Sequence, residues 1–524
     1  MPALGLVGWA RWIWRQLTSM KTALWLLVLL AIAAVPGSLV PQRTADPNGV
    51  LQYFKNNPDG ARVLDSLQAF DVYTSVWFSA IYLLLFISLV GCVIPRTRHH
   101  WIALRAAPPL TPRRLSRMPV HEAHEVDVQD SGPVRAELVE EGMRLLRRSR
   151  YRVVTYPEPG DPTGASQSVS AERGYLRETG NLLFHVALVG ILATIAIGGG
   201  YGYIGQRVVV EGQTFVNTRA AYDSFTPGRF FDNSMLDPYS LTLEKFSVQY
   251  EVQNPKALGM ATDYTARVSV RDQGSSQGHT SSIKVNEPLS VGGTEVYLLG
   301  NGYAPEITVK DPTGKVVFSD TIPFLPQDAN LTSLGVVKVP DGLKSQVGMI
   351  GFFYPTQAVA ANGAFYSAYP DLVTPLVTFN VYTGDLGLDS GAPKSVYTLD
   401  TSSMTQVTGR GTGIDSLQLT PGQTVQLPNG LGSVELTGIK RFASFQVAHD
   451  PTQGFVFGFA IVILVGLALA LFVPRRRLWV RINTSKTGRL VLEYAGLARG
   501  DDPGLAAAVT DLAQRHRSRF TNRD

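Results

Sequence analysis

One histidine of this 524-residue chain lies inside a long apolar stretch that contains no Asp, Glu, Lys or Arg. His185 occurs in segment 181–199, and the other seven histidines lie outside every stretch of this kind. Counted at 1.5 Å per residue, it lies roughly 6–8 Å from the start of that segment. An ionisable side chain inside a membrane helix is costly unless it has a partner, so His185 is a candidate ligand or a hydrogen-bond donor to a neighbouring helix. The segment alone leaves both interpretations open.

Two further residues could take part in chemistry at the ends of apolar stretches. Cys92 is the only cysteine, which excludes a disulfide framework, a CxxC redox pair and a cysteine-based zinc or iron-sulfur site. A buried thiol is usually a small apolar side chain, so structural packing is the simpler hypothesis for Cys92. His449 lies just outside the last apolar stretch, where a solvated boundary histidine is a simpler interpretation than a ligand.

Two motifs resemble known sites but lack the required context. The run 121–125, His-Glu-Ala-His-Glu, does not have the HExxH spacing that places two imidazoles on one helix face. The run 200–205, Gly-Tyr-Gly-Tyr-Ile-Gly, follows an apolar helix instead of opening a helix after a strand, which argues against a dinucleotide site. The sequence also shows no pairing of a nucleophile with a base.

The elements that position these residues are four uncharged apolar windows. They lie at 22–40, 75–94, 181–199 and 454–474. Each is long enough for a helix of about 20 residues to cross a hydrocarbon core of about 30 Å. A signal peptide is the competing interpretation of the first window, but the run is long for one and has no clear cleavage pattern.

The basic residues divide between the two sides of the predicted membrane. Segments 1–21, 95–180 and 475–524 hold 28 of the 47 Lys and Arg residues, whereas 41–74 and 200–453 hold the other 19 in a much longer length of chain. By the positive-inside rule both termini are cytoplasmic. The net charge of +5 is therefore a topology signal, and nucleic-acid binding is not expected.

The two largest soluble segments differ in pattern. In 95–180, apolar residues at helical spacing over 134–146 lie between strand-like runs at 122–128 and 151–156, which predicts a small α+β module. In 200–453, strand-like runs alternate with Gly, Pro, Asn and Asp, which predicts an all-β, sandwich-like domain. These runs are 241–252, 264–271, 295–299, 306–310, 315–319 and 432–439.

The predicted fold is a polytopic α-helical membrane protein with a large all-β extracytoplasmic domain and a small α+β cytoplasmic module. The expected order is a cytoplasmic N-terminus (1–21), a first helix (22–40), an outer loop (41–74), a second helix (75–94), a cytoplasmic loop (95–180), a third helix (181–199), the β-rich domain (200–453), a fourth helix (454–474) and a cytoplasmic tail (475–524). The predicted location is the cytoplasmic membrane.

An ordered set of motifs resembles the ResB (CcsB) family of System II cytochrome c biogenesis proteins. The motifs are SMKTAL (19–24), PGSLVPQ (36–42), DVYTSVWF (71–78) leading to Cys92, ERGY (172–175), GNLLFH (180–185), VNEPL (285–289), GDLG (384–387) and RRRLWV (475–480). They cover the chain from residue 19 to about residue 480 in order. The layout of three helices, a large outer domain and a fourth helix agrees with the family.

The resemblance implies a subunit that handles haem. With a ResC (CcsA)-type membrane partner, such a protein carries b-type haem transiently across the membrane and presents it to the CxxCH motif of apocytochrome c. His185 matches the position of an axial haem ligand in the family, and the basic residues of the cytoplasmic loop, Arg177 among them, would face the propionates. The partner would supply the other ligand and the tryptophan-rich loop, and thiol-reducing proteins would act in the same pathway.

Two alternatives remain. The chain could be a structural or chaperone subunit that holds the partner or the apocytochrome without binding haem. A transporter with its own path is weaker, because the four windows contain no carboxylate, Lys or Arg and no inverted repeat is evident. Any haem-attaching activity would belong to the complex, since no catalytic centre is visible in this chain.

The topology can be tested by labelling introduced cysteines in a Cys92→Ser background. A membrane-impermeant maleimide should modify Ser275→Cys from outside intact cells, and Ser518→Cys only after permeabilisation, because the positive-inside rule places them on opposite sides. The reverse pattern would overturn the whole arrangement.

Overall fold

The protein is described by a computed structural model that defines residues 5–129, 131–157, 167–275, 277–388, 396–485 and 487–521. The chain folds into two compact units. One combines Met1–Ile197 with Thr452–Asp524, and the other is Gly198–Pro451. The second unit is therefore inserted in the sequence of the first.

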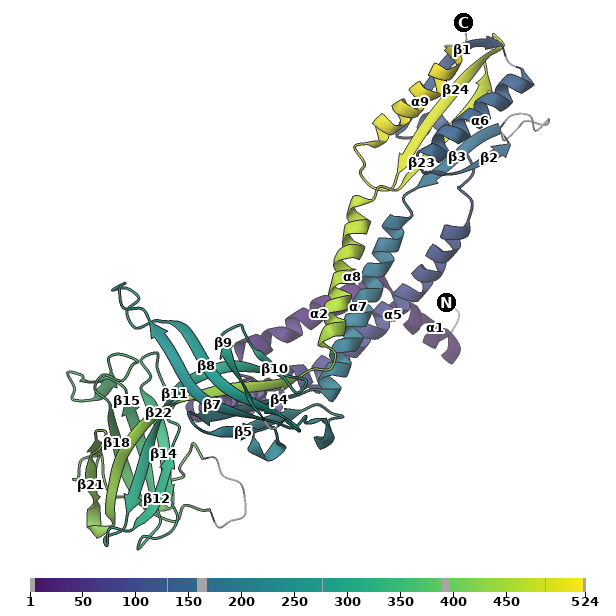
Figure 1. Cartoon of the computed structure of the whole chain (residues 1–524). Coiled ribbons are helices and arrows are strands. Elements are labelled where there is room, and N and C mark those ends of the chain that lie inside the picture. The colour runs from purple at the N-terminus through teal and green to yellow at the C-terminus, as the bar shows by residue number, and fades with distance from the viewer. Residues whose placement is uncertain are drawn as a thin grey trace. The chain divides into compact units, whose positions relative to one another are not determined.

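Within the described residues, four helices are long and apolar enough to cross a membrane, as predicted (Figure 1). They are α2 (Met20–Leu39), α5 (Val76–Arg105), α7 (Leu176–Tyr201) and α8 (Gln453–Phe472). Serine residues cap the N-termini of two of these helices. The Ser19 hydroxyl accepts from the Thr22 amide at the start of α2, and the Ser75 hydroxyl accepts from the Phe78 amide at the start of α5. Such caps satisfy amides that have no partner within the helix.

The second membrane helix is longer than the uncharged window that predicted it. The window 75–94 ends before Pro95, whereas α5 continues through this proline to Arg105 and measures 30 residues. The window marks only the uncharged part, and the Arg, His, Trp, Ile, Ala and Leu residues that follow Pro95 have no strong tendency to end a helix. The extension carries His99 and His100 as part of the helix.

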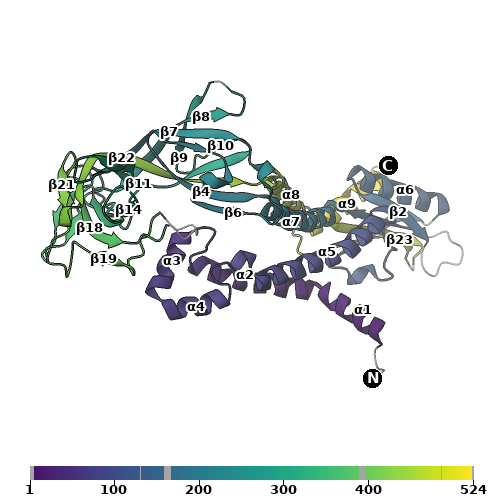
Figure 2. The ribbon, with the colours of Figure 1, turned by 90° about the horizontal axis from the view of Figure 1, so that it is seen from below.

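Shorter helices flank the membrane segments. Helix α1 (Leu6–Leu17) lies in the segment 1–21 and meets α2 at an angle (Figure 2). Between α2 and α5, helices α3 (Pro47–Asn56) and α4 (Pro58–Ser66) pack around Phe70, and the 3₁₀ turn η1 (Val72–Thr74) follows.

The membrane unit also contains the α+β module. Its antiparallel sheet has the order β1-β24-β23-β3-β2, and helices α6 and α9 pack on one face. The elements are β1 (Val120–Gln129), α6 (Gly132–Arg148), β2 (Arg152–Pro157), β3 (Gln167–Arg173), β23 (Arg476–Thr484), β24 (Arg489–Ala498) and α9 (Leu505–Thr521). On the opposite face Leu115, from the turn η2 (Leu115–Arg117), packs against Trp479 and Ala495.

The structure corrects the expectation of a C-terminal tail. Residues after 475 supply β23, β24 and α9, and these two strands lie between β1 and β3 in the sheet. Alternation explains the placement, because Leu478, Val480 and Ile482 face the helices while Trp479 faces the other side. The loop 95–180 alone would leave β1 unpaired and β3 paired only with β2.

The inserted unit is antiparallel and β-rich, and the helical turns among its described residues are short 3₁₀ turns. These turns are η3 (Arg219–Ala221), η4 (Asn233–Met235) and η5 (Pro428–Gly430). The largest sheet contains β4 (Tyr203–Val210), β6 (Ser224–Pro227), β10 (Leu289–Val291), β11 (Thr294–Lys310), β12 (Val316–Thr321), β21 (Thr424–Leu427) and β22 (Gly432–His449). A second contains β13 (Leu325–Pro326), β14 (Ser333–Val339), β15 (Val347–Tyr354), β18 (Leu376–Gly384), β19 (Met404–Gln406) and β20 (Leu417–Leu419). A third contains β5 (Thr214–Val216), β7 (Tyr239–Tyr250), β8 (Ala261–Asp272) and β9 (His279–Lys284), and β16 (Gln357–Val359) pairs with β17 (Phe365–Ser367).

The described part of this unit, predicted as an all-β, sandwich-like domain, has two main cores. One surrounds Phe324, Phe353 and Phe379, and the other surrounds Phe246 and Phe445. The long strands β11 and β22 pair along nearly their whole length and contribute to both. The runs 295–299 and 306–310 were expected as separate strands because Gly300, Asn301 and Gly302 interrupt the apolar pattern, yet all belong to β11.

A buried histidine joins the two helices of the α+β module and makes its stability depend on pH. His516 is fully buried, accepts from the Tyr494 hydroxyl at Nδ1 (2.8 Å) and donates from Nε2 to the Leu138 carbonyl (2.9 Å). Burial lowers the pKa of His516 from 6.5. The unfolded chain therefore takes up a proton near pH 6.5 that the folded module does not, and stability falls as the pH drops below that value.

We expect the hydrogen-exchange protection of α9, corrected for intrinsic rates, to decrease between pH 7.5 and pH 5.5. At pH 7.5, His516→Ala should cost about 2–4 kcal/mol because it leaves a cavity and two buried groups without partners. The exposed His279, replaced by Ala, is the control. Equal protection at both pH values would show that His516 is not the titrating group.

Candidate functional site

A cavity of about 300 Å³ lies against His185 in the membrane unit. It is lined by Val93, Arg96, His99, His100 and Ala103 of α5, by Glu178, Asn181, Leu182 and His185 of α7, and by Arg475 and Arg499. Spacings of three and four residues place these α5 and α7 side chains on facing sides of the two helices. The cavity therefore lies where α5 and α7 meet the first residues of the α+β module.

Side-chain hydrogen bonds connect α5 to α7 on both sides of the cavity. Toward the other end of the helices, the Tyr82 hydroxyl donates to the Leu192 carbonyl. At the cavity, His100 Nε2 lies 2.9 Å from the Thr179 hydroxyl oxygen. Thr179 donates its own proton to the Tyr175 carbonyl (3.2 Å), so it accepts from His100.

The hydrogen bond of His185 defines which of its nitrogens is available. Nδ1 lies 2.7 Å from the Asn181 carbonyl oxygen, one helical turn earlier. A carbonyl only accepts, so Nδ1 carries the proton and, in the neutral imidazole, Nε2 has a free lone pair. Metal-ligating histidines commonly donate from the other ring nitrogen in this way. Since α7 begins at Leu176, His185 lies about 14 Å along the helix.

Basic side chains from α5 and from the module line the cavity. Arg475 lies 3.3 Å from Glu178, which also bonds Arg499. Arg96 comes from α5, so three guanidinium groups face one carboxylate among the lining residues. The positive surplus suits a ligand with more than one acidic group.

A buried carboxylate holds this basic end in place. Glu172 is 3% exposed and lies 2.8 Å from Arg475 and 3.1 Å from Arg477, and it accepts from the Tyr175 hydroxyl at 2.7 Å. Burial alone would raise the pKa of Glu172, but the bonds from Tyr175 and Arg475 and the two guanidinium charges outweigh burial and lower it. The carboxylate is therefore charged and fixes Arg475 beside the cavity.

Close packing of α7 on α8 fixes the position of His185. A Cβ at Gly466 of α8 would come within 2.7 Å of the Phe184 amide and 2.8 Å of the Gly180 carbonyl. At the other end of the contact, Thr452 donates to the Thr194 carbonyl at 3.1 Å. Small residues allow helices to approach this closely in a membrane.

Cys92 does not line the cavity; it contacts the junction of α1 and α2. Its thiol donates to the Thr18 carbonyl (2.8 Å), and the nearby Ser88 hydroxyl donates to the Leu17 carbonyl (2.5 Å). Gly91 gives Thr18 room to approach, because a Cβ there would meet the Thr18 methyl group at 2.1 Å. These contacts give Cys92 a structural role at a helix corner.

The other two candidates also lie outside the cavity lining. His449 belongs to the inserted unit, where Nδ1 bonds the Gly293 carbonyl at 2.7 Å and the ring stacks on Tyr203. Arg177 donates to the backbone carbonyl of Arg499, whose side chain does line the cavity.

The His-x-x-His run of the module does not form a metal site. Residues three apart on a strand point to opposite faces, and in β1 His121 lies 3.9 Å from Glu493 while His124 lies 3.2 Å from Glu122. Among all described residues, no three His, Cys, Asp or Glu side chains form a group that could hold a metal ion.

Sequence reasoning missed His99, His100, Arg96, Arg475 and Arg499 as neighbours of His185. Arg96, His99 and His100 lie beyond the uncharged window 75–94, although the spacing from Val93 to Ala103 continues one helix face past its end. Arg475 and Arg499 are about 300 residues from His185 in sequence, and no local pattern links them.

Comparisons with known proteins agree with the sequence resemblance. A family model described as the ResB-like family matches residues 20–510. The cytochrome c biogenesis protein CcsB of Gloeobacter violaceus (strain ATCC 29082 / PCC 7421) is 25% identical over 335 residues, which are 59% of this chain and 63% of the relative. The protein of the same name from Synechococcus sp. (strain WH7803) is 29% identical over 296 residues, 54% and 58% of the two lengths. The match therefore covers less than two thirds of these relatives.

One solved structure, the cytochrome c heme lyase CcmF, aligns with 78% of this chain and 42% of its own at 9% identity and a TM-score of 0.22. This value is too low to indicate a shared fold.

The α7–α8 contact predicts that a side chain at Gly466 is not tolerated. Gly466→Leu should lower the thermal unfolding temperature of the full-length protein in detergent, because the overpacked contact costs about 1–3 kcal/mol. Gly458→Leu is the matched control, since no atom of the described chain lies within 4 Å of a Cβ there. If both variants unfold at the same temperature, the close contact does not stabilise the helix pair.

Proposed function

Because the chain belongs to the ResB-like family, we propose that it is a haem-handling subunit of cytochrome c biogenesis in which His185 supplies one axial ligand to the haem iron. The observation that carries the proposal is the hydrogen bond from His185 Nδ1 to the Asn181 carbonyl, which leaves Nε2 free on the cavity-lining face of α7. Haem is the cargo here, of b-type and held transiently.

The residues of the cavity fit haem in their chemistry. A neutral imidazole is an ordinary axial ligand, and its bond to a backbone carbonyl orients the ring and raises the basicity of Nε2. The apolar walls come from Val93, Ala103 and Leu182. The propionates would meet Arg475 and Arg499 at the end of the cavity nearest the α+β module.

The size of the cavity supports a role for a partner subunit. Its volume of about 300 Å³ is at the lower limit of pockets that enclose a small ligand, about 300–1,000 Å³. The chain would cover one edge of the macrocycle, and a ResC (CcsA)-type membrane subunit would supply the remaining wall and the second ligand. The complex would then present haem to apocytochrome c, which thiol-reducing proteins keep ready for attachment.

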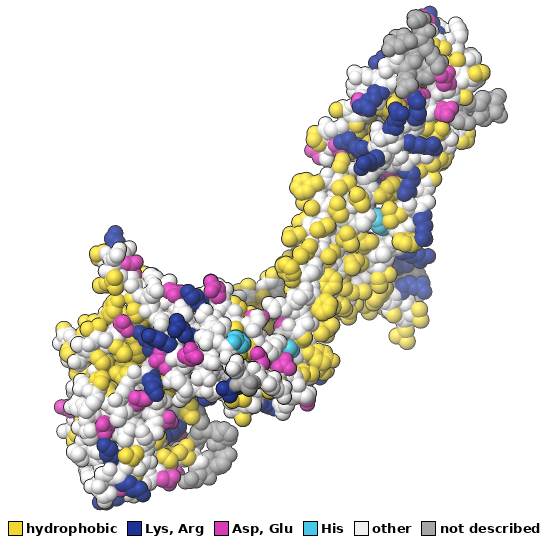
Figure 3. Space-filling model, in the orientation of Figure 1, with side chains coloured by type: hydrophobic (Ala, Val, Ile, Leu, Met, Phe, Trp, Pro, Cys, Tyr) yellow, Lys and Arg dark blue, Asp and Glu magenta, His cyan; other side chains and the backbone are white. Residues whose placement is uncertain are grey.

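The proposed orientation in the cytoplasmic membrane follows from the charge distribution. The α+β module carries most of the basic side chains near the apolar helices, and Figure 3 shows Lys and Arg side chains over it next to the hydrophobic surface of the helices. We place this module and both termini in the cytoplasm and the inserted unit outside. Haem would then bind near the cytoplasmic leaflet.

The test is His185→Ala in cells that contain the partner. Even the loss of a group that supports a metal ligand typically costs about 10–100-fold in metal affinity, so loss of the ligand itself should reduce haem retention by at least about tenfold. The Soret absorption of the purified complex should disappear or shift, and cytochrome c maturation should fall. Added imidazole, which can occupy the vacated position, should restore part of both.

Two control variants separate this effect from general damage. Cys92→Ser changes a helix-corner contact, and His449→Ala changes the inserted unit, so neither should alter the haem spectrum. If His185→Ala retains an unchanged spectrum and full maturation, His185 is only a helix-packing residue. Unchanged haem together with lost partner binding would indicate a structural subunit instead.

A further inference from the structure

A second cavity, of about 520 Å³, lies in the α+β module and shares no lining residue with the cavity at His185. It is bounded by the C-terminal end of α6, by α9 and by the first residues of β23. The lining residues are Leu145, Leu146, Arg148, Ser149, Tyr151, Arg173, Arg476, Leu478, Ala508, Asp511, Leu512, Arg515 and Ser518. We call this cavity the arginine pocket.

The arginine pocket has a surplus of positive charge. Arg515 pairs with Asp511 at 2.8 Å, and Arg476 makes a two-pronged contact with Asp502 at 2.6 and 2.8 Å. These two carboxylates offset two of the four arginines. Arg148 and Arg173 remain without a carboxylate within 4.0 Å among the described residues.

The arginines of the pocket come from different elements, so attraction of basic side chains to one helix C-terminus does not account for all of them. Arg148 ends α6, where a basic side chain complements the partial negative charge of the helix C-terminus. Arg173 and Arg476 instead belong to the neighbouring strands β3 and β23, where they are paired residues. Arg173 also donates to the Ser149 carbonyl at 3.1 Å and lies over the Tyr151 ring, 4.6 Å from its centre, so its guanidinium is held in the pocket.

The Tyr151 hydroxyl lies in the pocket beside the Arg476 guanidinium. Tyr151 is 6% exposed, and its buried hydroxyl oxygen lies near the Arg476 guanidinium without a hydrogen bond of normal geometry in the described chain. Buried hydroxyls are nearly always bonded, so an unbonded one requires an explanation. Beside Arg476 it could donate to an anion that the guanidinium also binds.

The pocket is close to the membrane surface. Arg173 is three residues before α7 begins at Leu176, and Arg476 is four residues after α8 ends at Phe472. At about 3.3 Å per extended residue, both lie within roughly 10–13 Å of the apolar helices, next to the layer of lipid headgroups. Basic pockets at this depth commonly bind anionic headgroups.

We propose that the arginine pocket binds a phosphate-bearing anion through Arg148, Arg173 and Arg476, with the Tyr151 hydroxyl as a further donor. Guanidinium groups bind phosphate through paired hydrogen bonds, which makes arginine more suitable here than lysine. Lipid headgroups and soluble phosphates share this chemistry. Since β3 leads into α7 and α8 leads into β23, the bound anion would hold together the strand ends that adjoin these two helices.

Binding can be measured on the full-length protein with two probes. Inorganic pyrophosphate, titrated by calorimetry at constant ionic strength in a neutral detergent, represents a soluble anion. Phosphatidylglycerol in nanodiscs, compared with phosphatidylcholine alone, represents a headgroup, and native mass spectrometry counts the lipid that stays bound. Saturable binding of pyrophosphate identifies a soluble ligand, and retention of phosphatidylglycerol without pyrophosphate binding identifies a lipid.

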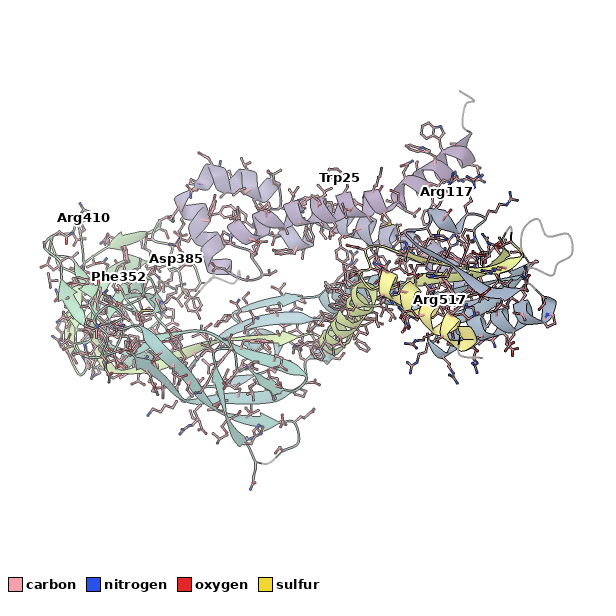
Figure 4. All side chains as sticks on the ribbon, turned by 90° about the horizontal axis from the view of Figure 1, so that it is seen from above. Trp25, Arg117, Phe352, Asp385, Arg410 and Arg517 are labelled. Carbon is pink, nitrogen blue, oxygen red and sulfur yellow. The ribbon has the colours of Figure 1, made fainter. Side chains whose placement is uncertain are left out.

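The double variant Arg148→Gln/Arg173→Gln should weaken binding of the effective probe on the order of tenfold or more, and Tyr151→Phe about three- to tenfold. Arg489→Gln is the matched control, because Arg489 lies in the same module, is half exposed and pairs with Asp127 outside the pocket. Arg517→Gln is a second control, because Arg517, labelled on α9 in Figure 4, contacts His124 of β1 and does not line the pocket. If the double variant does not fold, Tyr151→Phe decides, because it removes a single oxygen atom and leaves the ring in place.

The proposal is wrong if neither probe binds the unaltered protein. It is also wrong if Arg489→Gln weakens binding as much as the pocket variants, because the attraction would then be that of the whole basic surface.

Discussion

The pairing of β3 with β23 is the constraint on which the membrane site depends. Strand β3 leads into α7 and α8 leads into β23, so the register Arg173↔Arg476 and Glu172↔Arg477 fixes where the two helices leave the sheet. Their adjacency then allows Gly180 and Gly466 to touch and gives His185 a fixed place on α7. The inserted unit separates these strands by about 300 residues, so their pairing closes a very long loop, and the entropic cost of closing such a loop grows only slowly with its length.

The buried Glu172 carboxylate is central to that closure. It bonds Arg475 and Arg477 at the first residues of β23, and Arg475 in turn reaches Glu178, which also holds Arg499. A buried ion pair is weak support for net stability, but removing one partner typically costs about 3–5 kcal/mol because the other charge is left buried. The network therefore specifies geometry: it keeps the guanidinium groups that line the cavity at defined positions before any ligand arrives. The buried, fully hydrogen-bonded Glu172 carboxylate thus holds positive charge beside the cavity.

The sequence was informative where a pattern is local. Absence of charge located the four helices, an isolated ionisable residue drew attention to His185, and Gly, Pro, Asn and Asp separated most strands of the inserted unit. It failed where partners are distant or where a local signal is misleading. Residues after 475 looked like a basic tail because alternation in 476–484 does not reveal which strands flank them, and the Gly300-Asn301-Gly302 run looked like a turn although it lies within a paired strand. Lining residues such as Arg499 carry no signal in sequence, because only the sheet brings them to α7.

The helix pair α7–α8 is constrained at both ends, and this distinguishes it from α5. At one end the pair continues into β3 and β23, and at the other into β4 and β22, which pair from Tyr203↔His449 onward. Between these ends, glycine contacts and the Thr452–Thr194 hydrogen bond fix the spacing. Helix α5 has no such strands next to it in sequence, and side-chain hydrogen bonds such as Tyr82–Leu192 and His100–Thr179 join it to α7. A ligand beside His185 would contact one wall in which α7 packs closely on α8, and a second wall from α5, which side-chain hydrogen bonds join to α7.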